Sequence, residues 1–486
     1  MCKFRVFFIS TPAIGNLVPI VEFAQRLVHH DPRFSATILI ISLSQRPIVN
    51  SYIQSRSSTY SNINFIHLPP VDSPSPDQYQ SAVGYISLVS QKHRPHVKDE
   101  IAKLQQTESD SARVCALFVD MFTTAMIDVA NELNIPCYLY FASPVTFLGL
   151  MLHLPVIDVQ LATEFIESDN ELIVPKDPAT ELIIPGFANP LPPKVLPTSV
   201  LKRRSDGYSW FLYHTRRYVE TKGVVVNTYR ELEKYAITSV EATTTVPRIF
   251  PVGPVLDLAG PIEWHPERDQ QDRIMKWLNN QPRSSVVFLC FGSMGSLGRS
   301  QLREIAIGLE RSGFRFLWSI REPPKGKLDL PGEYASVEEI LPEGFLNRTA
   351  EIGLVCGWVP QVTILANQAI GGFVSHCGWN SILESLWYGV PIATWPIYAE
   401  QQMNAFELVA ELGLAVEIRV DYRSESGDMV LAEELERGIK RLMDGDDEVR
   451  RKVKEMSEKS RMAVMENGSS CASLTSLIEN LTSGIS

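Results

Sequence analysis

Short apolar runs alternate with segments of helical periodicity along the first half of the chain. The apolar runs are rich in β-branched and aromatic residues, which is typical of strands, and the segments between them repeat apolar residues every three or four positions. Because the runs are apolar throughout, we expect a parallel sheet with helices on both faces. The predicted strands are Arg5–Ser10, Ala36–Leu43, Ile63–Leu68, Val114–Asp120, Cys137–Ala142 and Gly223–Thr228, and the predicted helices include Leu17–His30, Gln91–Gln105 and Thr124–Leu133.

A segment rich in proline and glycine, from Thr243 to about Gln271, interrupts this alternation and is typical of an interdomain linker. The same pattern then restarts. Predicted strands are Ser285–Gly292, Phe314–Ile320, Gly353–Trp358, Gly372–Ser375, Pro391–Pro396 and Ala415–Val420. Predicted helices are Ser300–Ser312, Asn380–Tyr388, Gln402–Leu412 and Ala432–Met443, followed by a charged helical end from Glu448 to Leu481 with a break near Gly468.

The pattern predicts an α/β protein with two doubly wound, Rossmann-like domains. We expect a first domain at 1–245, a linker at 246–271, a second domain at 272–465, and a C-terminal helix at 466–486 that packs back on the first domain. Such sheets bind ligands beyond the carboxyl ends of their strands. Two domains that face a common cleft would therefore hold one substrate each.

The composition narrows the class of partner. The chain has 486 residues, 45% of them hydrophobic, which is enough to build two or three domains. Its formal net charge of −11 argues against nucleic-acid binding, which usually needs a basic face. A nucleotide remains compatible with this charge, because backbone amides at helix N-termini bind phosphates.

Cysteine usage and the start of the chain indicate a cytoplasmic protein. The seven cysteines are scattered without a C-x-x-C pair, as expected for reduced thiols, and no secretory signal is visible. The longest apolar stretch, about Val145 to Val159, contains His153 and Pro155, and we expect it to be too short for a transmembrane segment.

Two patterns resemble metal sites, but neither is convincing. Cys377 follows His376, yet no further His/Cys pair lies at ligand spacing, so a buried thiol is the better interpretation. Asp444 and Asp446 have the D-x-D spacing by which some transferases hold a divalent ion, but they lie in an acidic turn between two amphipathic helices. We therefore expect no metal.

Candidate chemistry is concentrated between Trp358 and Gln401. His376 and Gly378 follow a predicted strand, and Asn380 and Ser381 open a helix. A strand, a glycine turn and a helix N-terminus form a phosphate-binding geometry, because amide donors and the positive end of the helix dipole face the anion.

Other residues of this segment suit the rest of a nucleotide sugar. Glu384 follows Asn380 by four positions and shares its helix face, where a carboxylate can accept bonds from a ribose diol. Trp358 offers a flat face on which a base can stack. Glu400 and Gln401 follow the next strand and are suited to sugar hydroxyls.

The stretch from Trp358 to Gln401 resembles the 44-residue signature box of plant secondary-product UDP-glycosyltransferases, and the resemblance extends over nearly the whole chain. It implies a GT-B fold, an inverting mechanism without metal, and UDP-glucose as co-substrate, since relatives that use glucose commonly have the glutamine at Gln401. It also assigns the roles of single residues. Trp358 would stack on uracil, with Val359 and Gln361 beside the base and ribose; Ser293, His376, Gly378, Asn380 and Ser381 would bind the diphosphate; Glu384 would bind the ribose; and Glu400 and Gln401, with Trp379 alongside, would bind the sugar.

The chain departs from the family pattern at the expected catalytic base. The family has a His after the first strand, oriented by an Asp that corresponds to Asp120, but this chain has Asn16 there. An amide cannot act as a general base, whose assistance is typically worth about 10²–10⁴-fold. His29 and His30 lie at the far end of the same predicted helix, roughly 20 Å away.

Three readings of Asn16 remain open. The acceptor is acidic or nucleophilic enough, or Asp120 close enough, for transfer without the His; or the residue is an engineered substitution; or the protein binds UDP-sugars with little transfer. An epimerase on the same fold ranks low, because the loop offers only Asn16. Smaller departures are Ala142, where some relatives have a sugar-contacting Thr, Asn367, where the box usually has His, and Glu400 in place of the more usual Asp.

The acceptor pocket is expected in the first domain. Its candidate residues are Met121, Phe122, Phe147, Leu150 and Phe187, each of which suits a hydrophobic core equally well. Together they favour a flat, apolar acceptor such as a flavonoid, another phenol, a carboxylate or a terpenoid. We expect a monomer that transfers glucose to such a molecule, with a UDP-sugar-binding protein as the alternative.

Overall fold

The computed structural model describes residues 4–41, 47–106, 112–168, 171–243, 246–260, 268–324, 326, 329–424, 427–445 and 447–483. Its internal contacts divide the chain into two units. The first comprises Met1–Pro190, Ser199–Asp257 and Met462–Ser486, and the second comprises Leu191–Thr198 and Leu258–Arg461. The segment Leu191–Thr198, which lies inside the first domain predicted from the sequence, thus belongs to the second unit.

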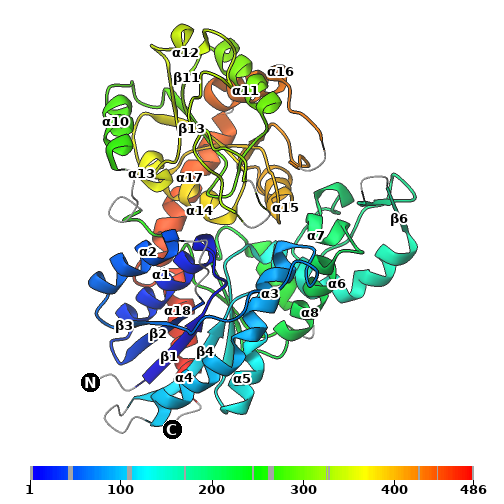
Figure 1. Ribbon diagram of the computed structural model, residues 1–486, viewed down its shortest axis with the longest axis vertical. Helices are drawn as coiled ribbons and strands as arrows, with labels where there is room; N and C mark the ends of the chain where they lie inside the picture. Colours follow the sequence, from blue (N-terminus) through cyan, green and yellow to red (C-terminus); the bar gives the residue numbers. More distant parts are fainter. Residues whose placement is uncertain are drawn as a thin grey trace. The chain divides into compact units, whose positions relative to one another are not determined.

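The first unit is built on a seven-stranded sheet in which every pair of neighbours is parallel (Figure 1). In spatial order its strands are β3 (Ile63–His67), β2 (Phe34–Ile40), β1 (Phe4–Ile9), β4 (Arg113–Val119), β5 (Cys137–Phe141), β8 (Val224–Val226) and β9 (Ile249–Pro251). The six predicted strands are confirmed, although residues 42 and 43 of the second one lie outside the described residues. The edge strand β9 falls within the segment predicted to be a linker.

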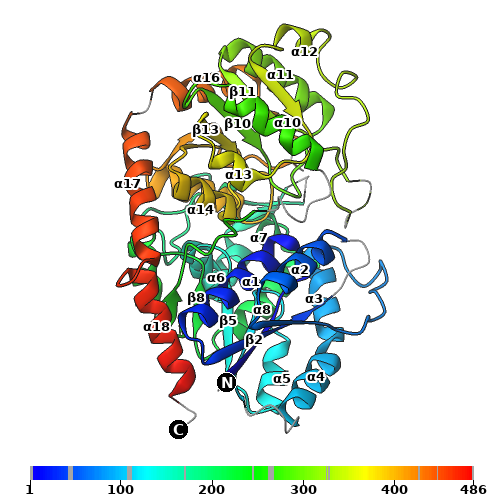
Figure 2. The same cartoon turned by 90° about the vertical axis from the view of Figure 1, so that its left-hand side faces the viewer.

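The helices of the first unit occupy the segments between these strands. They are α1 (Ile14–His30), α2 (Pro47–Thr59), α3 (Ala82–Lys92), α4 (Arg94–Gln106), α5 (Met126–Glu132), α6 (Val145–Thr163), α7 (Thr198–Leu201), α8 (Asp206–Tyr218), α9 (Lys234–Glu241) and α18 (Ser469–Thr482), with a small antiparallel hairpin of β6 (Phe165–Glu167) and β7 (Ile173–Pro175). Helix α18 runs alongside the sheet (Figure 2) and packs against β9 and β4. The Tyr138 hydroxyl donates to Asn480 Oδ1 over 2.5 Å and ties α18 to β5.

Helix α6 corrects one expectation from the sequence. It has 19 residues and a mean hydropathy of 1.6, so by length and composition alone it suffices to cross a membrane, and it is the one such helix in the described part of the chain. In its most apolar stretch, 56% is buried inside the protein. It packs against α8 and α9, so its apolar side chains serve the core of the first unit.

The second unit contains a six-stranded parallel sheet. In spatial order its strands are β12 (Gly353–Cys356), β11 (Arg315–Ser319), β10 (Val286–Cys290), β13 (Ile370–Ser375), β14 (Ile392–Thr394) and β15 (Ala415–Glu417). Its helices are the 3₁₀ turn η1 (Pro193–Val195), α10 (Arg268–Asn279), α11 (Arg299–Ser312), α12 (Phe345–Arg348), α13 (Gln361–Leu365), α14 (Trp379–Tyr388), α15 (Gln401–Phe406), the π-helical turns η3 (Glu407–Glu411) and η4 (Arg441–Gly445), α16 (Ala432–Lys440) and most of α17 (Asp447–Val464). The strands predicted for this half are confirmed.

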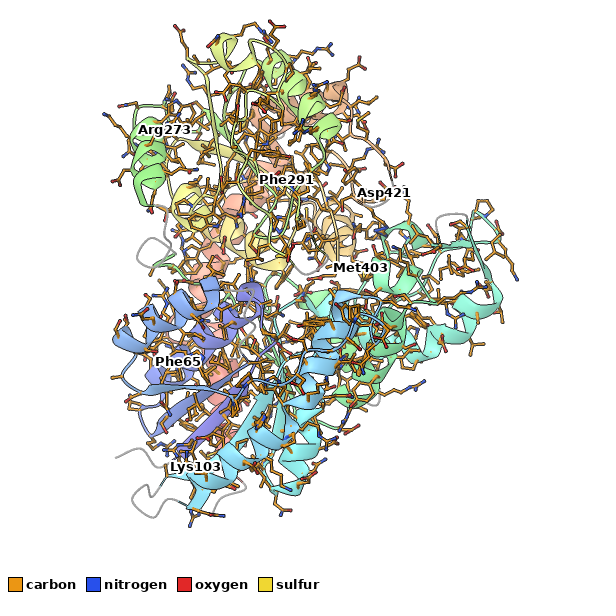
Figure 3. The ribbon with its side chains drawn as sticks, in the orientation of Figure 1. Phe65, Lys103, Arg273, Phe291, Met403 and Asp421 are labelled. Atoms are coloured by element: carbon orange, nitrogen blue, oxygen red, sulfur yellow. The ribbon has the colours of Figure 1, made fainter. Side chains whose placement is uncertain are left out.

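Aromatic packing fixes the centre of the second unit. Phe288 and Phe373 stack across β10 and β13 with ring centroids 5.1 Å apart, and Phe291 meets Trp395 edge-on at 5.4 Å. In Figure 3, Phe291 lies in the interior of this unit, whereas Arg273 lies on the outer side of α10. Gly389 adopts a left-handed conformation, φ +72°, and ends α14 where the sequence predicted.

Both sheets have a switch point at which the strand order reverses. In the first sheet β2 and β3 extend to one side of β1, and β4 and β5 extend to the other; β10 and β13 form the equivalent central pair in the second. Ligands of doubly wound sheets bind at such switch points, beyond the carboxyl ends of the strands. Asn16, at the start of α1, and the loop with Asp120 follow β1 and β4, and the loops with Ser293 and His376 follow β10 and β13.

Candidate functional site

The loops after β10 and β13 meet at His376. This side chain is buried, with 6% of its surface exposed. A Cβ atom added at Gly292 would lie 2.5 Å from His376 Nε2, and one added at Gly378 would lie 2.6 Å from it. Only glycine fits at either position, so the loop that carries Ser293 is held directly against the predicted phosphate-binding turn.

Burial decides the charge of His376. It lowers the pKa of this imidazole to about 4, although a hydrogen bond with the Cys290 backbone acts in the opposite direction. Without a ligand His376 is therefore a neutral hydrogen-bonding group near pH 7, and the negative charge of a bound phosphate would act to raise its pKa. Its Nδ1 atom is buried and has no hydrogen-bond partner among the described residues, which is unusual for a buried polar atom.

The first turn of α14 continues this site. Gly378 is the N-cap, with φ −65° and ψ 139°, and it has no side chain with which to cap the helix. Helix N-termini carry amide groups without partners inside the helix and a partial positive charge, so they attract anions. Asn380 and Ser381 lie in this turn, as the sequence predicted.

Gln361 links the residues assigned to the ribose and the phosphate. Its Nε2 atom donates to Ser381 Oγ over 2.8 Å and to Glu384 Oε2 over 2.7 Å. Three residues that are up to 23 positions apart in the sequence are thus brought together. The Glu384 carboxylate is held by Gln361, which the resemblance had placed beside the base and the ribose.

The segment at Trp358 is anchored by a residue that sequence reasoning missed. Glu333 Oε1 accepts a hydrogen bond from the Trp358 backbone amide over 2.8 Å. The same carboxylate lies so close to Gly357 that an added Cβ atom would be 1.6 Å from Glu333 Oε2. Trp358 is half-buried, whereas Val359 is buried, so the indole is the larger surface available to a base.

The predicted sugar-binding residues begin α15. Gln401 is buried, and its Oε1 atom accepts hydrogen bonds from the backbone amides of Ile397 and Tyr398 over 2.9 and 3.0 Å. Its carbonyl oxygen is therefore engaged within the protein, and its amide nitrogen is the group suited to a sugar hydroxyl. Glu400 is half-buried as the N-cap, whereas only 3% of Trp379 is exposed.

In the first unit, Asp120 joins the loops after β1 and β4. Its Oδ2 atom accepts hydrogen bonds from the Thr11 amide and from Ser10 Oγ, and its Oδ1 atom accepts them from the amides of Phe122 and Thr123, both over 3.0 Å. Burial raises the pKa of this carboxyl, and these hydrogen bonds act in the opposite direction. Because both oxygens are engaged in shaping the loops, the geometry disfavours Asp120 itself as the base.

Asn16 lies in the first turn of α1 and is half-buried. The backbone amide of Asn16 donates to the Ala13 carbonyl over 3.0 Å. This hydrogen bond continues the turn from the β1 loop into the helix. His29 and His30 are the last two residues of α1, and His30 Nε2 lies 3.0 Å from Thr475 Oγ1 of α18. Neither histidine replaces the base that is missing at position 16.

Two of the predicted acceptor residues contact α8, a helix outside the ranges named from the sequence. The rings of Phe122 and Phe147 both contact Phe211, at centroid distances of 6.2 and 6.4 Å. Phe187 and Met121 are each 6% exposed and Leu150 is fully buried. Leu150 is therefore best described as a residue of the hydrophobic core, the alternative that the sequence also suited.

Helix α8 also holds the Asp120 loop. His214 is buried, with Nδ1 2.7 Å from Thr124 Oγ1 and Nε2 2.8 Å from Ser87 Oγ, and burial lowers its pKa to about 3. The Tyr218 hydroxyl donates to the Met121 carbonyl over 3.0 Å. The repeat of large residues at 211, 214 and 218 is the sequence signal that could have revealed this helix face.

The structure offers little for a metal ion. Among the described residues no group of three or more His, Cys, Asp or Glu side chains is placed to bind one. Asp446 of the D-x-D pattern lies outside those residues. Two further residues depart from the family pattern. Asn367 shapes the turn before β13 by accepting a hydrogen bond from the Ala369 amide over 2.9 Å, and Ala142 is half-buried after β5.

Comparisons with known proteins agree with this arrangement. Residues 213–452 match the family described as UDP-glucoronosyl and UDP-glucosyl transferase. UDP-glycosyltransferase 43 of Pueraria montana var. lobata is 55% identical over 99% of this chain and all of that protein. UDP-glucose flavonoid 3-O-glucosyltransferase 6 of Fragaria ananassa is 44% identical over 98% of both chains.

Solved structures extend the similarity to three dimensions. The crystal structure of Medicago truncatula UGT71G1 complexed with UDP-glucose has a TM-score of 0.88 and 44% sequence identity, and the match covers 99% of this chain and 98% of that one. A transferase from Siraitia grosvenorii in complex with UDP has a TM-score of 0.86 and 45% identity. The chain therefore belongs to the plant UDP-glycosyltransferases and is a UDP-dependent glycosyltransferase of the GT-B fold.

Proposed function

We propose that this enzyme transfers glucose from UDP-glucose to a small hydrophobic acceptor, with inversion at the anomeric carbon and without a metal ion. The observation that carries the proposal is the convergence of Gln361, Ser381 and Glu384 beside the His376 turn, at the switch point of the second sheet. This cluster provides donors for a diphosphate and an acceptor for a ribose. The crystal structure of a relative complexed with UDP-glucose supports the choice of donor.

The residues suggest how the leaving group is stabilised. Departure of UDP leaves negative charge on the diphosphate, and preorganised amides at a helix N-terminus stabilise such charge without reorganisation. We propose that the first turn of α14 and His376 serve this task, together with Ser293 on the adjoining loop. Trp358 would stack on uracil, Val359 would line its edge, and the Gln401 amide would donate to the sugar, with Glu400 and Trp379 nearby.

The first unit constrains the acceptor. Asn16 is not a base, and both oxygens of Asp120 bind loop amides. An acceptor that loses its proton readily avoids this problem, so we propose phenols and carboxylic acids, with the half-buried ring of Phe122 as a surface for their rings and the buried Phe147 supporting it from behind through Phe211. The names of flavonoid glucosyltransferases among the relatives agree with this class.

A second candidate function is the binding of UDP-sugars with little or no transfer, which Asn16 favours. Incubation with UDP-glucose and a panel of phenolic and carboxylic acceptors, read by mass spectrometry, separates the two. We expect a glucosylated product whose anomeric proton, in NMR spectra, has the β configuration, and an unchanged rate in the presence of EDTA. UDP-glucose binding without product from any acceptor would instead establish the binding protein, and an α-linked product would exclude inversion.

A further inference from the structure

The turn that carries His376 has an unusual backbone conformation. Cys377 has φ +62°, a left-handed conformation that disfavours residues with a Cβ atom. Its side chain is fully buried, and burial raises the pKa of the thiol to about 12, so it stays protonated. A strained residue of this kind persists only where its surroundings hold it in place.

One of the contacts that hold it comes from α15. Asn404 is fully buried on this helix, and its Nδ2 atom donates to the Cys377 carbonyl over 2.9 Å. From the other side of the residue, the Cys377 amide donates to Ser375 Oγ over 3.1 Å. The two peptide groups of Cys377 are thus fixed independently, one from β13 and one from α15.

The orientation of the second peptide group matters for the ligand. In a trans peptide the C=O and the following N–H point in opposite directions. Since Asn404 binds the Cys377 carbonyl, the Gly378 N–H of the same peptide group points away from α15. Gly378 is the N-cap of α14, where amides face a bound anion.

We propose that Asn404 is a positioning residue of the donor site, which keeps the Cys377–Gly378 peptide in the orientation that presents the Gly378 N–H to the diphosphate of the nucleotide sugar. This inference rests on the proposed donor site. Without Asn404, this peptide group is free to rotate about ψ of Cys377 and φ of Gly378, and such a rotation turns the N–H away from the ligand. In the intact protein α15 begins with Gln401 and also carries Asn404, so this one helix would position both the sugar and the diphosphate.

The test compares two ligands that differ in the diphosphate alone. Asn404→Leu has a similar volume and no donor, and we expect it to weaken UDP binding about 10- to 100-fold, as for a lost hydrogen bond to a charged group, while uridine binding stays unchanged. Isothermal titration calorimetry with UDP and with uridine gives the ratio of the two affinities for each variant. This ratio does not depend on the overall stability of the protein.

Gln402→Leu is the matched control. Gln402 is also fully buried on α15, and its Nε2 atom donates to the Tyr422 carbonyl over 2.8 Å, away from the phosphate turn. It should retain the wild-type ratio of UDP to uridine affinity even if its melting temperature falls. If Asn404→Leu does not fold, Asn404→Ser provides the smaller replacement.

The outcomes distinguish this inference from the function on which it rests. If the wild-type protein binds UDP no more tightly than uridine, the proposed donor site is wrong. If the wild type prefers UDP and the Asn404 variants keep that preference, or lose both ligands equally, Asn404 has no role specific to the diphosphate and the inference is overturned.

Discussion

Replacing Asn16 by His tests the most consequential departure from the family. The new imidazole would lie in the first turn of α1, where the positive end of the helix dipole favours its neutral, basic form. General-base assistance is typically worth about 10²–10⁴-fold in rate. We expect kcat/KM to rise about 10²-fold, at the lower end of this range. The Asp120 oxygens that would orient the imidazole already bind the amides of Thr11, Phe122 and Thr123.

The assay is kcat/KM with UDP-glucose and two acceptors, an aliphatic alcohol and an acidic phenol. The alcohol should gain most from Asn16→His, because it retains its proton until attack. Asn367→His is the control, since Asn367 lies in the turn before β13 and should leave both rates unchanged. If Asn16→His still binds UDP and neither acceptor gains, the first turn of α1 does not place this residue beside the reacting hydroxyl.

Three further changes probe other parts of the structure. Gln361→Ala removes both hydrogen bonds to the ribose and phosphate residues, and UDP should bind about 10-fold more weakly by calorimetry; unchanged affinity would mean that the cluster does not contact the nucleotide. Gly292→Ala places a Cβ atom 2.5 Å from His376 Nε2, so overpacking should cost about 1–3 kcal/mol in urea unfolding and weaken UDP binding; wild-type values for both would refute the close contact. Burial lowers the pKa of His214 from 6.5 to about 3 in the folded protein. As the pH drops below 6.5, the unfolded chain therefore binds a proton at this residue that the folded protein does not bind. The free energy of unfolding should consequently fall by up to about 1.4 kcal/mol per pH unit. That slope should decrease in His214→Gln, and an identical pH dependence in the variant would contradict the assignment.

The strands of both sheets could be predicted from the sequence because each is a short, continuously apolar run. The same local reasoning missed β9, whose Ile249–Pro251 run lies in a proline-rich segment. It also assigned Leu191–Thr198 to the first domain. That segment is held in the second unit by long-range contacts, such as the salt bridge between Lys194 and Asp421 at 3.0 Å, and no local pattern encodes them.

In the candidate site, too, local sequence patterns revealed some residues and long-range contacts determined others. Residues of the signature segment were found because their chemistry is contiguous in the sequence. Glu333, Asn404 and His214 were missed because each acts through tertiary contacts, which include those to Trp358, Cys377 and Thr124 respectively. A motif does not report burial, so the sequence could not show that Trp379 and Val359 expose little surface or that burial lowers the pKa of His376.

We propose that glucose is transferred to acceptors that give up a proton without a histidine base. This proposal is tested by kcat/KM of the wild-type enzyme with UDP-glucose and a series of similarly shaped phenols of graded pKa. We predict product formation with rates that rise as the acceptor pKa falls. Equal rates across the series would reveal an efficient base that the structure does not identify, and the absence of product from every phenol and carboxylic acid, with UDP-glucose bound, would contradict the assignment of transfer itself.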